Sequence, residues 1–274
     1  MLDVTAGERL GRRDRSLVIR KGVAAMKSIT GMERFLEGAE YELRRRPESP
    51  TPAAHRPVIT ISRQAGSGAH VVAEALVAGL QSRDPQASPP WTMFDRDLVE
   101  RVLQDHKLPE RLAEFMPEDR VSGIADTIDE LLGVHPPTWT LVRKTADTIL
   151  RLAEIGNVVV IGRGGNVITD RLAYALHVRL VGSVPRRIQH LQDYLHIGPA
   201  EAAEYLRTRD AARRRYVAKY YERDIDDPLL YHLVVNTDRV TYEEAARLIL
   251  GAVHERLDQT APVGAAVDAV APAI

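Results

Sequence analysis

The chain has 274 residues, of which 45% are hydrophobic and 27% are charged, and its formal net charge is −1. This length allows one large α/β domain with appendages, and the charge excludes a protein whose whole surface binds nucleic acid. The sequence contains no cysteine, which excludes disulfides, thiolate metal ligands and a thiol nucleophile. No apolar run reaches membrane-spanning length, and the first residues lack the pattern of a signal peptide. We therefore expect a cytoplasmic protein that does not enter membranes.

Three regions are predicted along the chain. Residues 1–57 form an N-terminal extension, in which residues 29–46 carry apolar side chains at helical spacing and the proline-rich segment 47–57 is a linker. Residues 58–257 alternate short β-rich runs with helical patterns, which is typical of one α/β domain. The tail at residues 258–274 is rich in alanine, proline and valine, and it is predicted to be disordered.

The central region predicts about five parallel strands with helices on both faces of the sheet, because helical patterns separate its short apolar runs. In such a sheet, ligands bind at the carboxyl ends of the strands. The predicted strands are Val58–Ser62, Trp91–Phe94, Val158–Ile161, Leu176–Val181 and His232–Val235. Helices are predicted at Val71–Leu80, Asp97–His106, most of Pro109–Thr148 and Tyr242–Leu257.

A glycine-rich turn between the first predicted strand and helix has the layout of a phosphate-binding loop. Such a loop reads G-x-x-x-x-G-K-[ST], with its lysine on the phosphates and its hydroxyl on magnesium. With Gly68 at the second glycine, Ala69 stands at the lysine and His70 at the hydroxyl. The alternative is a structural βα turn. The candidate nucleotide-binding residues are Arg63, Gly66, Ser67, Gly68, Ala69 and His70.

Two further strand ends carry polar residues that suit a substrate. Asp95 and Arg96 follow the second predicted strand, and Arg163 follows the third between glycines. An arginine in such a turn can make two-point contact with a phosphate. The alternatives are a helix cap for Asp95 and a structural salt bridge for Arg163. Ile161 stands where many phosphate-binding-loop enzymes place a magnesium-orienting acid.

The segment at residues 207–223 is strongly basic. Its Arg209 and Arg213 are four residues apart and share one face of a predicted helix. Mobile arginines of this kind neutralise the charge of a phosphoryl group in transfer. The alternatives are a solvated helix face or an RNA-binding strip, since Tyr216, Tyr220 and Tyr221 interleave with the charges. No histidine cluster has metal-ligand spacing.

With these motifs in this order, residues from about 58 to 253 resemble the cytidylate-kinase-like family of P-loop proteins, which are relatives of the nucleoside monophosphate kinases. The residues that carry the resemblance are Ile59–Gly68, Phe94–Leu98, Val160–Gly164, Arg209–Arg213 and Asp227–Thr237. The resemblance implies a three-layer P-loop NTPase fold with a helical monophosphate-binding insertion after Asp95 and a helical lid.

The resemblance further implies a transferase, namely a nucleotide kinase that moves the γ-phosphoryl group of ATP to CMP or dCMP, with Mg²⁺ bridging the phosphates. Arg163, Arg209 and Arg213 would be the catalytic residues, and Asp95, Arg96 and Arg163 would bind the acceptor. Two alternatives remain open. One is a kinase with a non-nucleotide acceptor. The other is a regulatory nucleotide-binding protein without turnover, in which the helix at residues 29–46 binds a protein partner.

Overall fold

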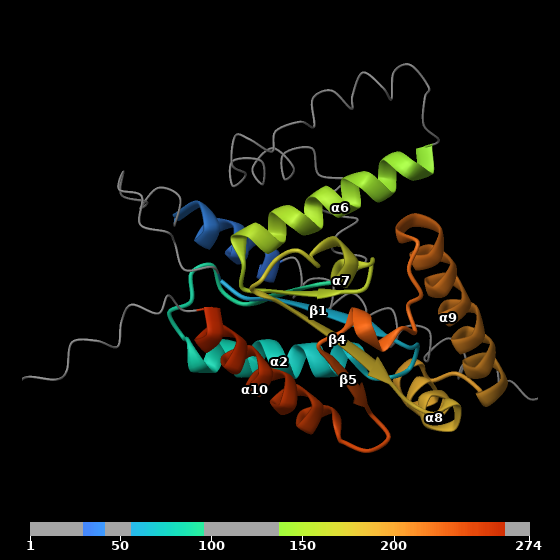
Figure 1. Cartoon of the computed structure of the whole chain (residues 1–274). Coiled ribbons are helices and arrows are strands. Elements are labelled where there is room, and N and C mark those ends of the chain that lie inside the picture. Colours follow the sequence, from blue (N-terminus) through green and yellow to red (C-terminus); the bar gives the residue numbers. More distant parts are fainter. Residues whose placement is uncertain (1–29, 42–55, 96–136, 261–274) are drawn as a thin grey trace, which may run out of the picture.

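A parallel β-sheet of five strands, in the order β2-β3-β1-β4-β5, lies at the centre of the computed structural model (Figure 1). The structure describes residues 30–41, 56–95 and 137–260. Every pair of neighbouring strands runs parallel, which confirms the predicted fold class and strand number. The strands are β1 (Val58–Arg63), β2 (Thr92–Phe94), β3 (Val158–Ile161), β4 (Ala175–Val181) and β5 (Leu233–Asn236).

Helices cover both faces of the sheet, as in a three-layer fold (Figure 1). α2 and α10 lie on one face, α6, α7 and the helix at residues 30–41 lie on the other, and α8 and α9 stand beyond the carboxyl ends of the strands (Figure 1). The bounds are α2 (Ala69–Arg83), α6 (Pro137–Ile155), α7 (Gly165–Ile168), α8 (Val184–Leu195), α9 (Pro199–Tyr221), η3 (Pro228–Leu230) and α10 (Tyr242–Thr260).

The face under α2 and α10 holds the larger apolar core. Val72, Leu76 and Leu80 recur at helical spacing on α2 and are fully or almost fully buried. Gly79 lets the two helices approach closely, because a Cβ atom there would lie 3.3 Å from Leu250 on α10. Each fully buried aliphatic side chain stabilises the fold by about 1.5–3 kcal/mol. This core fixes α2, and therefore the loop before it, against the sheet.

The helix at residues 30–41 belongs to the core on the opposite face. Phe35 and Leu36 are buried, and the ring of Phe35 meets that of Phe94 edge-on at 5.4 Å between centroids. This helix was predicted as part of an N-terminal extension, with partner binding as its role in the alternative of a regulatory protein. Its apolar side instead packs inside the domain, so that side is not a docking face. The partner role stays a prediction for its other surface.

Several predicted features lie outside the described residues. They are the helix Asp97–His106, the first part of Pro109–Thr148, Arg96, the monophosphate-binding insertion and the tail. In the ranges that are described, no helix combines the length and the apolarity needed to cross a membrane.

Candidate phosphate-binding site

The loop between β1 and α2 has the backbone of an anion-binding turn. Gly66 and Gly68 both have a φ of 76°, a left-handed conformation that glycine adopts at little cost. Gly68 is also the N-cap of α2, and no side chain caps that end of the helix. The first N–H groups of a helix lack partners within it and carry the positive end of its dipole. They are therefore available to an anion.

Side-chain and backbone contacts hold this loop in shape. The N–H and Oγ of Ser67 both donate to the carbonyl oxygen of Gln64, at 3.3 and 2.9 Å. The amide side chain of Gln64 in turn accepts a hydrogen bond at 3.0 Å from the N–H of Gly182, just after β4. The loop is thus closed on itself and attached to the neighbouring strand.

The turn after β3 is an unusual stretch of backbone. Gly162, Arg163 and Gly164 have φ values of 82°, 56° and 72°. Arg163 therefore adopts a left-handed conformation that costs a non-glycine residue free energy, and such strain tends to cluster at functional sites. The hydroxyl of Tyr221, at the end of α9, donates to the Arg163 carbonyl at 3.3 Å, and the Arg163 guanidinium lies over the Tyr216 ring at 5.9 Å.

Arg63 extends from the end of β1 across to this turn. Its guanidinium lies so close to Gly162 that a Cβ atom there would overlap it. The pKa of Arg63 is lowered to about 9, mainly by burial and then by the charges of Arg213 and Arg163, while Asp95 opposes the shift. The charges of two arginines from other elements, Arg163 and Arg213, thus act on Arg63, with the Asp95 carboxylate nearby. We call Arg63, Arg163 and Arg213 the arginine cluster.

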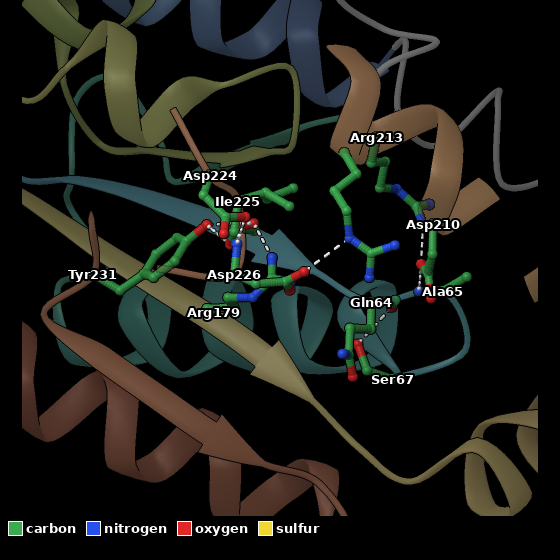
Figure 2. Close-up of polar contacts among 12 residues, drawn as sticks. Gln64, Ala65, Ser67, Arg179, Asp210, Arg213, Asp224, Ile225, Asp226 and Tyr231 are labelled. Carbon is green, nitrogen blue, oxygen red and sulfur yellow. Dashed lines mark hydrogen bonds and ion pairs between the residues drawn. The ribbon is translucent and has the colours of Figure 1, made fainter. Parts of the chain in front are cut away.

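Helix α9 meets the loop through Asp210, a contact shown in Figure 2. One carboxylate oxygen accepts a hydrogen bond from the N–H of Ala65 at 2.7 Å and another from Arg213 at 3.2 Å. The other oxygen pairs with Arg187 of α8 at 2.6 Å, and Arg187 also donates to the carbonyl of Ala65. Burial lowers the pKa of Arg213, against the effect of Asp210. Asp210 therefore fixes Arg213 beside the loop.

Arg209 and His70, which were also predicted at the site, lie outside the arginine cluster. Arg209 is exposed, with its guanidinium over the Tyr205 ring at 5.2 Å from the centroid. Of the predicted lid pair, only Arg213 contacts the groups around the loop. His70, in the first turn of α2, lies 3.9 Å from the carboxylate of Asp95, so the loop and the end of β2 face one another.

A second network ties α9 to the sheet beside the loop. The Asp226 carboxylate pairs with Arg179 of β4 (Figure 2). It also pairs with Arg214 of α9 at 2.9 Å. Although burial opposes the shift, hydrogen bonds from Arg214 and the charge of Arg179 lower the pKa of Asp226. Ser62, at the end of β1, accepts hydrogen bonds from Arg179 at 2.9 Å and from Tyr231 at 3.2 Å.

These residues do not form the usual magnesium site of a phosphate-binding loop. His70 replaces the hydroxyl, and Ile161 replaces the acid at the end of β3. Ser62 faces the cationic Arg179, and Ser67 donates to the loop backbone. In the part of the chain that the structure describes, no group of three or more acidic or histidine side chains is placed to hold a metal ion.

Sequence reasoning missed three contributors to this site. Asp210 lies in the predicted basic segment but was given no role there, and Arg187 and Tyr221 were not placed at the site at all. Arg187 is buried while its neighbour Arg186 is exposed, and the sequence Arg-Arg carries no signal that separates them. The acid at position 210, which has Arg207, Arg209 and Arg213 on both sides, was the one available signal, because an acid among arginines is a natural ion-pair partner.

Comparison with solved structures finds the fold in another protein, with a TM-score above 0.5. An uncharacterized protein from Eubacterium ventriosum matches 73% of this chain and 99% of its own, with a TM-score of 0.55 and 16% identity. TT1252 from Thermus thermophilus matches 73% of this chain and 98% of its own, with a TM-score of 0.36 and 14% identity.

Comparison with curated proteins gives a partial match. The uronate isomerase of Corynebacterium glutamicum is 24% identical over 110 residues, which are 40% of this chain and 21% of that enzyme. The chain thus spans about a fifth of that enzyme, which is too little to indicate a shared activity.

The family comparison covers most of the domain. Residues 58–239 match the cytidylate kinase-like family. The match contains the loop, the turn after β3 and the arginine-bearing helix α9. Because it spans more than half of the chain, this nucleotide-kinase-like protein belongs to the cytidylate kinase-like family.

Proposed function

We propose that the protein is a phosphotransferase that moves the γ-phosphoryl group of ATP to a pyrimidine nucleoside monophosphate. The leading candidates for this acceptor are CMP and dCMP. The observation that carries the proposal is the arginine cluster. The guanidinium of Arg63 lies against Gly162, next to Arg163. Asp210 joins Arg213 to the loop at Ala65. The charges of Arg213 and Arg163 both lower the pKa of Arg63. Packing like charges together costs free energy, which an anion between them offsets.

In this proposal each part of the site has a separate task. The N–H groups at the start of α2 bind the phosphates of ATP. Arg163, on its strained turn, grips the phosphate of the acceptor, and Arg213 neutralises the charge that develops on the phosphoryl group in transfer. Asp95 holds polar groups of the acceptor. Catalysis then consists of positioning and charge neutralisation.

A release assay for ADP tests this proposal. The purified full chain is supplied with ATP and each common nucleoside monophosphate in turn, with and without added magnesium. The proposal predicts that CMP or dCMP gives the fastest ADP release. If ATP binds and no monophosphate accelerates its turnover, the proposal fails for nucleotide acceptors, and a screen of small hydroxyl compounds then tests the kinase with another acceptor.

A second candidate is a regulatory nucleotide-binding protein without turnover. It is favoured by Ala69 at the lysine position and by Asp210, whose negative charge lies on the loop at the Ala65 N–H. It predicts that nucleotides raise the thermal unfolding midpoint by mass action and that no product forms with any acceptor.

A further inference from the structure

The loop is surrounded by many cationic groups and few ligands for a metal ion. Within the described residues, four guanidinium groups lie on or around it, from Arg63, Arg163, Arg187 and Arg213. The arginine cluster is close enough to depress the pKa of its own Arg63, and burial depresses that of Arg213 against the effect of a neighbouring carboxylate. Among the described residues, Asp95 and Asp210 place carboxylates beside these guanidinium groups, and the four described guanidinium groups outnumber them.

Arg63 is part of the fixed framework rather than of a moving lid. It is the last residue of β1, which pairs with β4 up to this position, and its guanidinium is seated against Gly162. The φ of 82° at Gly162 suits glycine, and a side chain at this position would displace the guanidinium. The positive charge of Arg63 is therefore present whether or not α9 moves.

This arrangement changes which form of a nucleotide the site favours. A metal-free polyphosphate carries its full negative charge, and its attraction to several guanidinium groups is correspondingly strong. A magnesium ion on the same phosphates cancels part of that charge and brings a double positive charge beside the arginines. This chain has His70 where a standard loop supplies a hydroxyl to the metal, and Ile161 where the end of β3 would supply an acid.

We propose that the loop and the arginine cluster bind the nucleotide as its metal-free polyphosphate anion. Arg63 then supplies positive charge that the lysine and the magnesium ion supply in a standard phosphate-binding loop. The identity of the nucleotide rests on the proposed function. The preference for a metal-free anion rests on the positions of the charges.

The test is a calorimetric titration of the full chain with the β,γ-imido analogue of ATP. Titrations in magnesium and in EDTA are compared at equal ionic strength, and inorganic tripolyphosphate is a second probe. The proposal predicts a Kd in EDTA no larger than the Kd in magnesium, for both probes. A Kd more than threefold larger in EDTA overturns it and leaves the proposed function standing. Metal-independent binding of tripolyphosphate without binding of the nucleotide supports the anion site and overturns the nucleotide function.

Variants separate the charge of Arg63 from its packing. Arg63→Gln is predicted to weaken binding in EDTA at least tenfold and to make magnesium favourable, whereas Arg63→Lys keeps metal-free binding. The matched control is Arg207→Gln, an α9 arginine whose side chain is 73% exposed, and it should leave both titrations unchanged. If Arg63→Gln does not fold by circular dichroism, Arg163→Gln takes its place. Equal Kd values for wild type and the folded glutamine variant in EDTA overturn the proposal.

Discussion

The carboxylate of Asp210 accepts a hydrogen bond from the backbone N–H of Ala65 at 2.7 Å, so helix α9 is joined directly to the glycine-rich loop. The same carboxylate pairs with Arg187 at 2.6 Å and with Arg213 at 3.2 Å. One acidic side chain therefore connects the loop, α8 and α9. The position of Arg213 follows from this contact.

Removing this carboxylate is predicted to destabilise the domain. The side chains of Asp210 and Arg187 are 14% and 7% exposed, and breaking such a pair leaves a buried guanidinium without its counter-charge. Asp210→Ala should lower the free energy of unfolding by about 3 kcal/mol, measured by urea denaturation.

The control for Asp210→Ala lies on the same helix. Glu204 pairs with Arg207 three residues along α9, as Asp210 does with Arg213, but both side chains of that pair are mostly exposed. Exposed pairs contribute little to stability. Glu204→Ala should leave the urea midpoint unchanged, and an equal loss in both variants would contradict a buried role for Asp210.

Gly68 is predicted to tolerate no side chain. Its φ of 76° disfavours any other residue, and a Cβ atom there would overlap the ring of Tyr242. Gly68→Ala should cost more than about 1 kcal/mol, the strain of the left-handed conformation alone. In a double-mutant cycle with Tyr242→Ala, the two losses should add to more than the loss of the double variant. The cycle is measured by chemical denaturation.

Gly251 gives the opposite expectation and serves as the control. It lies inside α10, and a Cβ atom added there would have no other atom within 4 Å outside its own helix turn. Gly251→Ala should stabilise the protein by about 1 kcal/mol, because alanine is the better helix former.

For the double-mutant cycle of Gly68→Ala and Tyr242→Ala, additive losses of stability would show that the Tyr242 ring does not contact the loop.

His177 makes stability depend on pH. It is buried on β4, bonds through Nδ1 to the Thr60 hydroxyl at 2.9 Å, and has its pKa lowered to about 3 by burial and by the charge of His232. The unfolded chain takes up this proton near pH 6.5. The contribution of neutral His177 is therefore complete above pH 6.5 and is lost as the pH falls from 6.5 toward 3.

Two measurements check this pH dependence. The free energy of unfolding of the wild type should fall over this window, and the slope should be smaller in His177→Gln. The imidazole signal of His177 in an NMR titration should stay that of the neutral ring down to about pH 4, well below the usual range. A midpoint near pH 6.5 would contradict the buried neutral state.

The sheet was predictable because its strands are short apolar runs between helical patterns. Val158–Ile161 was predicted with its observed bounds, since strand β3 is buried on both faces and its four residues are all apolar. Helix α8 was not predicted. Its apolar residues Val184, Ile188, Leu191 and Leu195 recur at helical spacing, so the signal for this helix was present in the sequence and was overlooked.

The candidate site was predictable only at its turns, where the sequence shows glycines that allow unusual backbone conformations. The glycines at 66 and 68 and the arginine between glycines at 163 were found because such turns require unusual φ values. The pairing of Asp210 with Ala65 spans 145 residues, and no local pattern encodes it. Arg63 was predicted to bind the nucleotide, but its contact with Gly162 was not predictable, because that contact depends on the order of the strands.

Arg213 is predicted to act in catalysis by donating two hydrogen bonds from its planar guanidinium to the phosphoryl group in transfer. Arg213→Lys keeps the charge but loses the planar guanidinium, and kcat should fall about 100-fold, the scale for removing a donor to transition-state charge. KM for ATP should change little. Steady-state kinetics with CMP measure both constants, and Arg207→Lys is the surface control. A rise in KM at unchanged kcat would assign Arg213 to ground-state binding instead.

The most direct test of the central claim is ADP formation in a single turnover of ATP with CMP, compared between the wild type and Arg163→Gln. The account predicts rapid ADP and CDP formation by the wild type and a loss of at least about 100-fold in the variant, at an ATP concentration that saturates both proteins. ATP binding by the wild type without ADP formation from CMP, dCMP or any other monophosphate would contradict the account.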